Sequence, residues 1–137
     1  MKEDQLYNIL IIASVIAIIA ILTLIFITKT SESFTELYFE DHQDLPNQIQ
    51  LNKEYLVQFS IHNLENEDTL YNYKSYIEYY KFNKLASTTT ILDDSITLNH
   101  DQTATIPIGF TMENSFESAK IIVETNNQEI HFWVEEQ

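Results

Sequence analysis

The chain has 137 residues, enough for one domain of ordinary size and a short appendage, so its length excludes a multidomain enzyme. It contains no cysteine, which excludes disulfide scaffolds, thiol catalysis and thiolate zinc sites. Twenty-one acidic residues against seven basic ones give a formal net charge of -14. This is the wrong sign for a surface that binds nucleic acid or anionic lipid, and we expect no nucleic-acid partner.

An apolar segment near the N-terminus predicts a single transmembrane helix over residues 7–28. Residues 9–27 contain no charge and no Asn, Gln, Gly or Pro. A helix over this segment can cross a hydrocarbon core of about 30 Å. Residues 1–6 are then a short flank and residues 29–33 a linker, and the lipid bilayer is the first expected partner of the chain.

A cleaved signal peptide is the main alternative for this segment. Residues 31–33, Ser-Glu-Ser, are the best match to a cleavage site. Signal peptides usually have a shorter apolar region, so we favour a retained anchor. A core helix of a soluble protein is disfavoured because the segment has no polar face. Small residues recur along it at helical spacing and would permit packing against a partner helix: Ala13, Ser14, Ala17 and Ala20.

The orientation of this anchor depends on a small charge difference. Lys2 and the terminal amine precede the segment, and Lys29 follows it. Positive charge favours the cytoplasmic side, so we expect the N-terminus inside and residues 34–137 outside the cytoplasm. Tyr7 and Lys29 are expected to lie at the membrane interfaces.

From Phe34 onward, alternating apolar and polar residues predict an all-β domain over residues 34–137. The expected strands are 34–40, 49–51, 55–62, 70–80, 88–92, 95–98, 103–111, 119–125 and 129–135. Residues 81–88 are expected to be a loop, and Asp93-Asp94 to separate two short strands. Asn126-Asn127 predicts a tight hairpin turn. Pro107 cannot donate to a strand ladder and predicts an edge position or a bulge.

Seven to nine short strands in this length are typical of an immunoglobulin-like antiparallel β-sandwich. A small closed barrel has the same sequence signature and stays an alternative. The expected core residues are Leu37, Phe39, Val57, Phe59, Ile61, Ile106, Ile108 and Trp133. With one glycine in the chain, asparagines are expected at the turn positions of positive φ: Asn63, Asn66, Asn99, Asn126 and Asn127.

No residue pattern predicts catalysis, a cofactor or a metal site, and we expect a protein that is not an enzyme. The histidines have no ligand spacing: His42, His62, His100 and His131. Acidic residues gather in predicted turns, where calcium is a weaker alternative to simple solvation: Glu40, Asp41, Asp44, Glu65, Glu67, Asp68, Asp93 and Asp94. The nucleotide-binding, hydrolase and metalloprotease fingerprints are absent from the sequence.

Tyrosine is frequent in the first half of the predicted domain. Six of the eight tyrosines lie between positions 55 and 80. Alternating tyrosines are most often explained by strand packing. They could also form an aromatic face that binds glycans or protein segments.

The two ends of the β domain resemble the archaeal membrane-linked family catalogued as domain of unknown function 1616. The matching residues are Phe34, Thr35, Glu36, Leu37 and Tyr38, then Ile61, Asn63 and Glu65, then Ile130, His131, Phe132, Trp133 and Val134. This chain lacks the family's turn glycines and has one predicted span where many members have several. The resemblance implies a β-sandwich at a membrane surface, and no catalytic residues.

Together these features predict a membrane-anchored, extracytoplasmic sandwich that acts by contact. It would be an interaction or assembly module of the cell envelope, or an accessory subunit of a membrane complex, with a protein partner at the membrane surface. A pilin-like filament subunit is the alternative, because it also joins an apolar helix to a β domain. Against it, a prepilin cleavage site has a basic and a small residue just before the apolar run, and the N-terminal sequence MKEDQLYN has neither in that place. An anchored hydrolase is the third hypothesis.

Overall fold

The computed structural model describes residues 3–27 and 32–137, which belong to two compact units divided between Glu32 and Ser33. The first unit contains helix α1 (Glu3–Ile27), in which none of the side chains is buried. Its length and composition are sufficient to cross a membrane. The predicted span is therefore helical to Ile27. Thr28, Lys2, Lys29 and linker residues 29–31 lie outside the described residues.

Two hydroxyl groups of α1 are satisfied within the helix itself. Ser14 Oγ donates to the carbonyl oxygen of Leu10 at 2.8 Å, and Thr23 Oγ1 donates to that of Ile19 at 2.7 Å. Such bonds leave no free hydroxyl donor on these two side chains to desolvate in lipid. The surface of α1 is therefore apolar even where the sequence has Ser and Thr.

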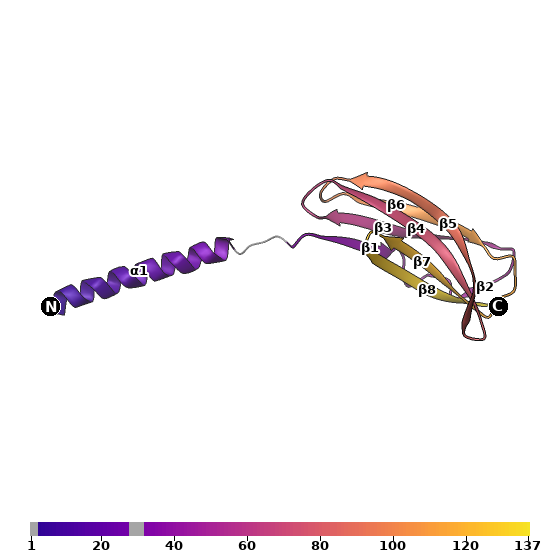
Figure 1. Cartoon of the computed structure of the whole chain (residues 1–137), viewed down its shortest axis with the longest axis horizontal. Helices are drawn as coiled ribbons and strands as arrows, with labels where there is room; N and C mark the ends of the chain where they lie inside the picture. The colour runs from indigo at the N-terminus through magenta and orange to yellow at the C-terminus, as the bar shows by residue number, and fades with distance from the viewer. Residues whose placement is uncertain (1–2, 28–31) are drawn as a thin grey trace. The chain divides into compact units, whose positions relative to one another are not determined.

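The second unit is a sandwich of two sheets, whose long strands run along one axis of the domain (Figure 1). Residues 32–137 contain eight strands: β1 (Phe34–Phe39), β2 (Gln48–Ile49), β3 (Glu54–Leu64), β4 (Thr69–Lys81), β5 (Lys84–Leu98), β6 (Thr103–Thr111), β7 (Ser118–Thr125) and β8 (Gln128–Glu136). One sheet has the order β1-β3-β6 and the other has the order β2-β8-β7-β4-β5. The pairs are antiparallel except for the short parallel pair of β2 and β8.

The predicted sandwich is confirmed, and a closed barrel is wrong because both sheets have edges. Pro107 lies on β6, at an edge of the three-stranded sheet, as predicted. At an edge, a residue without an N–H group costs no ladder bond on its free side.

The core lies between the sheets and matches most of the predicted set. Val57, Phe59, Ile61 and Ile108 are buried. Three others are partly buried against this core: Leu37, Phe39 and Ile106. Trp133 is the exception, since it is 48% exposed while its neighbours Phe132 and Val134 are buried. Alternation along β8 places only one of the two phases inward, and the apolar phase is that of Ile130, Phe132 and Val134, so the expected core position of Trp133 is wrong.

The region between positions 81 and 98 differs from the prediction. The expected loop 81–88 is wrong, because β4 and β5 form a hairpin whose turn is Phe82-Asn83. Both residues have positive φ, 53° and 58°. Asp93-Asp94 does not break the chain into two strands either, because Asp93 pairs with Lys74 across β4 and β5. An opposite charge on the neighbouring strand makes a carboxylate acceptable there.

The asparagine turns are partly as predicted. Asn66 and Asn126 have positive φ, and Asn126-Asn127 is the turn between β7 and β8. The prediction is wrong for Asn63, Asn99 and Asn127, which do not have positive φ. The other positions with positive φ in the described residues are Asp41, Asn52, Phe82, Asn83 and Asp101.

Candidate binding face

The outer face of the five-stranded sheet carries an exposed aromatic cluster. The strand register places Trp133 of β8 opposite Lys120 of β7, and Lys120 opposite Glu78 of β4. The ring of Trp133 lies 5.2 Å from that of Tyr80 on β4, at an interplanar angle of 53°. Because the two strands are not adjacent in the sheet, this pair bridges over β7.

Apolar side chains continue this cluster to the β4–β5 hairpin. Leu85 pairs with Tyr80 and is 54% exposed. Phe82, in the hairpin turn, is 88% exposed. We call Trp133, Tyr80, Leu85 and Phe82 the aromatic face. Exposed patches of this kind mark contact sites more often than scattered apolar residues do.

One buried apolar residue, Ile122, lies on the outer side of the same sheet, next to the aromatic face. Ile122 belongs to the outer phase of β7 and lies outside the core cluster between the sheets, yet it is only 1% exposed. Its cross-strand partners are His131 on β8 and Tyr76 on β4. Side chains that cover Ile122 are held in place by packing, so this part of the surface is preformed.

Acidic groups hold the tyrosines of this face in their neutral form. Tyr80 donates to Glu78 Oε2 at 2.7 Å, and this hydrogen bond raises the pKa of Tyr80. Burial, then the charge of Glu124, raises the pKa of Tyr76 to about 12. Lys120 Nζ lies 3.0 Å from Glu129 Oε1, and Lys74 Nζ lies 5.7 Å from the ring centroid of Tyr76. The face thus combines neutral aromatic rings with ion-paired edges.

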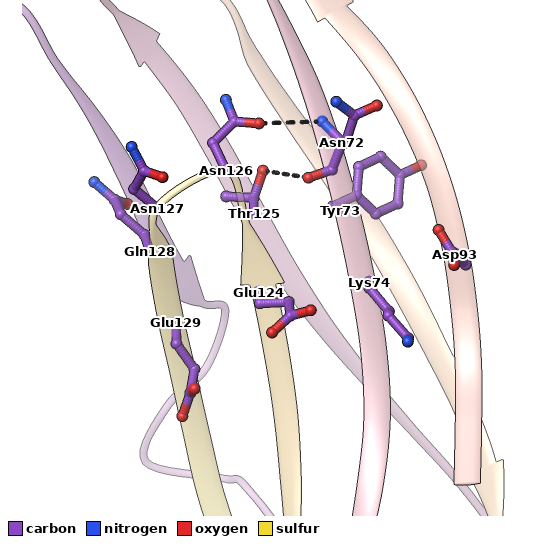
Figure 2. A pocket seen from close by; sticks show the side chains of 10 residues that line it. All are labelled: Asn72, Tyr73, Lys74, Asp93, Glu124, Thr125, Asn126, Asn127, Gln128 and Glu129. Carbon is purple, nitrogen blue, oxygen red and sulfur yellow. Dashed lines mark hydrogen bonds between the residues drawn. The ribbon is translucent and has the colours of Figure 1, made fainter.

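An open polar hollow of about 580 Å³ lies at the opposite end of the same sheet, beside the β7–β8 turn (Figure 2). Figure 2 shows Asn126 and Thr125 joined to the backbone of Asn72 on β4. The Asn126 side-chain oxygen accepts from the Asn72 N–H group at 3.4 Å, and Thr125 Oγ1 donates to the Asn72 carbonyl at 3.0 Å. These hydrogen bonds hold the β7–β8 turn against β4 and leave fewer polar groups for a ligand, so the hollow is a weaker candidate than the aromatic face.

The tyrosines of β4 divide between the two sides of the strand, and a binding role for them stays a prediction. Tyr71 and Tyr73 are buried between the sheets, as strand packing requires. Tyr76 and Tyr80 belong to the opposite phase of β4. The sequence analysis did not identify Trp133 as a surface residue or Phe82 as a turn residue. The positive-φ tolerance of Asn83 beside Phe82 was the signal for a two-residue hairpin.

The histidines and acidic clusters do not converge on a metal site within residues 3–27 and 32–137. His62 Nδ1 lies 3.0 Å from Glu36 Oε2, and His62 Nε2 lies 3.0 Å from Asp101 Oδ1. Both hydrogen bonds raise the pKa of His62, the bond to Asp101 most. This arrangement uses both ring nitrogens for carboxylates and links β1, β3 and the turn before β6.

Two of the phrases that resemble domain of unknown function 1616 meet at one end of the sandwich. Thr35 Oγ1 donates to Glu65 Oε1 at 2.7 Å, and Glu65 N–H donates to Asn63 Oδ1 at 2.9 Å. Asn63 is fully buried. Thr35, Asn63 and Glu65 therefore connect β1 to the end of β3, and their arrangement is structural.

No family model matches the chain, and no curated protein sequence matches it. Among solved structures, the CARDB domain of the PF1109 protein from Pyrococcus furiosus, in complex with di-metal ions, has a TM-score of 0.56 at 13% identity, covering 80% of this chain and 97% of that one. A β-glucosidase from Listeria innocua has a TM-score of 0.62 at 15% identity, covering 76% of this chain and 16% of the enzyme. The Pseudomonas fluorescens DNA glycosylase AlkC has a TM-score of 0.61 at 11% identity, covering 75% of this chain and 30% of that one.

These likenesses concern the fold alone. The chain spans about a sixth of the length of the β-glucosidase chain that it matches, since 16% of that chain is covered. It spans nearly all of the CARDB domain. The β domain therefore has an immunoglobulin-like sandwich fold, and its function has to be argued from its own surface.

Proposed function

We propose that this chain is a single-pass membrane protein whose sandwich lies outside the cytoplasm and binds a protein partner through the aromatic face. In this role it serves as an interaction or assembly module of the cell envelope, or as an accessory subunit of a membrane complex. Membership of domain of unknown function 1616 is part of this proposal.

The observation that carries the proposal is the exposed pair of Trp133 and Tyr80, with ring centroids 5.2 Å apart. Trp and Tyr dominate the energetics of protein interfaces because they bury large rings at low cost in conformational entropy. Leu85 extends this pair into a continuous apolar surface. Glu78 and Glu135, on either side of it, supply the polar rim that interfaces usually have.

The apolar helix supports the membrane-anchored half of the proposal. None of the side chains of α1 is buried, and from Ile9 to Ile27 its surface is apolar on every side. Such a helix is stable in lipid and costly in water. A binding role is preferred to catalysis because the aromatic face offers no nucleophile next to a general base.

Site-directed photo-cross-linking in intact membranes tests the binding face. A photoreactive residue at Leu85 should cross-link a protein of a different mass from this chain, whereas the same residue at Leu56 should not. Leu56 is exposed on β3, in the other sheet, and serves as the matched control. Trp133→Ala should abolish the cross-link at Leu85 without changing membrane insertion. Equal cross-linking from both positions, or a cross-link that survives Trp133→Ala, would contradict the proposal.

Protease protection tests the orientation. A protease added to intact cells should remove an epitope tag placed after Gln137 and leave a cytoplasmic control protein intact. Digestion that requires lysis would place the sandwich in the cytoplasm and move the search for the partner there.

A further inference from the structure

The longest sheet edge of the domain is the free side of β5. Within the described residues, β5 pairs with β4 and with no other strand. The other three edges are short or interrupted: β1 has 6 residues, β2 has 2, and β6 carries Pro107 near its middle. A long edge presents unpaired backbone N–H and C=O groups and is a template for another strand.

The middle of β5 lacks charged residues and proline, two of the usual protections of an edge. Residues 85–92, LASTTTIL, contain no charged residue, Pro or Gly. Thr and Ile favour extended backbone. The register with β4 shifts on both sides of residues 87–90 and is regular between them, where these residues pair with residues 76–79. Strand addition is therefore centred on this regular stretch.

The charged residues that flank this stretch allow two copies of β5 to form ion pairs with each other. Lys84 lies at one end, and Asp93-Asp94 lies at the other. If a second β5 pairs antiparallel about Thr89, Lys84 of each copy faces Asp94 of the other. By their register with β4, opposite Lys81 and Tyr73, both side chains belong to the same side of the sheet. Directly opposed residues of an antiparallel pair share a face, so this register is allowed.

We propose that the occupant of this edge is a second copy of this chain, paired through antiparallel β5 strands about Thr89. The contact is isologous, so one two-fold axis generates both ion pairs. It joins the two five-stranded sheets into one and places both aromatic faces on the same side. Leu85 is the member of the aromatic face that lies on β5, so the mass of a cross-linked product distinguishes the two proposals: a second copy of this chain for the β5 edge, and a different protein for the aromatic face.

The two-fold pairing also fixes how the ends of the domains are directed. Phe34 pairs with Leu64, and Thr69 pairs with Leu98, so the chain enters the sandwich at the end where β5 finishes. Antiparallel pairing of β5 then points the two Phe34 ends in opposite directions. The pair is therefore suited to join chains that approach from opposite sides.

Cysteine cross-linking of the full chain in detergent is the direct test, because the natural sequence contains no cysteine. In Thr89→Cys the two thiols meet at the two-fold axis, and mild oxidation should convert most of the protein into a disulfide-linked dimer. Thr111→Cys, on the exposed edge strand β6, is the matched control and should stay largely monomeric. Equal dimer yields from the two variants would overturn the proposal.

Charge variants in the Thr89→Cys background test the register. Lys84→Glu should weaken the dimer roughly tenfold, because two cross-strand ion pairs become repulsions. Lys53→Glu makes the same change in net charge on a residue outside β5 and should have no such effect. The double variant Lys84→Asp with Asp94→Lys should restore dimerisation. Equal effects of Lys84→Glu and Lys53→Glu would overturn the proposal.

Cross-linking in cells tests the choice of occupant. Thr89→Cys should yield a species of twice the monomer mass in densely packed cells, whose membranes face one another, as well as in detergent. A cross-link only to a chain of another mass, with no dimer of the purified protein, would assign the β5 edge to a different protein and overturn self-pairing.

Discussion

The hydroxyl group of Tyr71 on β4 lies 3.1 Å from Oδ1 of Asn63 on β3 and donates to it, so the two sheets are joined by a polar contact inside the sandwich. Asn63 Nδ2 donates to the carbonyl oxygens of Glu67 and Leu98, both at 2.8 Å. Asn63 is therefore fully paired although it has no exposed surface. It holds the turn after β3 and the end of β5 against β4.

Removal of this amide should destabilise the domain more than any exposed asparagine does. Asn63→Ala leaves several buried groups without a partner and should lower the free energy of unfolding by about 3 kcal/mol. Tyr71→Phe removes the hydroxyl group that contacts Asn63 Oδ1 and Thr35 Oγ1 and should cost about 1–2 kcal/mol. Chemical denaturation measures both values. Asn127→Ala, at an exposed turn position, is the control, and a loss as large as that of Asn63→Ala would contradict the prediction.

Truncation of the two adjacent aromatic residues of β8 should lower the free energy of unfolding by different amounts. Phe132 is buried and packs edge-on against Phe39 with ring centroids 5.2 Å apart, so Phe132→Ala should cost about 3 kcal/mol or more. Trp133→Ala removes a half-exposed ring and should cost less than about 1 kcal/mol. Since Trp133 is the one tryptophan of the chain, its fluorescence should also be readily quenched by iodide or acrylamide. Equal losses of stability, or a quencher-resistant emission, would place Trp133 in the core.

His62 should make the stability of the domain depend on pH in the neutral range. Its hydrogen bonds to Asp101 and Glu36 raise its pKa above the ordinary value of 6.5. The stabilisation is complete below pH 6.5, where the unfolded chain also carries the proton, and it is lost as the pH rises through the folded-state pKa. The free energy of unfolding should fall over this interval in the natural protein relative to His62→Asn. A difference between the two proteins that does not change with pH would refute the linkage.

Salt should stabilise the β domain. Residues 29–137 carry six lysines and nineteen acidic residues, a formal charge of 6 − 19 = -13. Repulsion within this surface is screened over about 10 Å at 0.1 M salt, so the melting temperature should rise with NaCl. Calcium chloride of equal ionic strength should give the same rise if the acidic turns are only solvated. A larger rise with calcium would instead reveal a specific site.

The full chain should behave as an integral membrane protein. Extraction of membranes with alkaline carbonate should leave it in the pellet, because α1 is apolar on every side from Ile9 to Ile27. A chain that begins at Ser33 should be recovered in the supernatant under the same conditions. Release of the full chain by carbonate would contradict the membrane-spanning assignment.

The sequence by itself determined the division into a spanning helix and an all-β domain. A long run without charge can satisfy its backbone in lipid only as a helix, and alternation with period two can bury only one face of a strand. These rules act on neighbouring residues. They were sufficient to predict the inward positions of Val57, Phe59, Ile61 and Ile108, the edge position of Pro107, and the turn at Asn126.

Only the tertiary structure decided which exposed side chains gather into the candidate site. Alternation along β8 already separates Phe132, in phase with Ile130 and Val134, from Trp133, in phase with His131 and Glu135. The contact of Trp133 with Tyr80 depends on the order β8-β7-β4 in the sheet. The strand position of Asp93 was also decided by tertiary structure: its sequence predicts a turn, and the pairing of β4 with β5 places Lys74 opposite it. The aromatic face and the β5 edge depend on such pairings between distant segments. These pairings follow from the order of strands in the sheet, and the periodicity of a single strand does not predict that order.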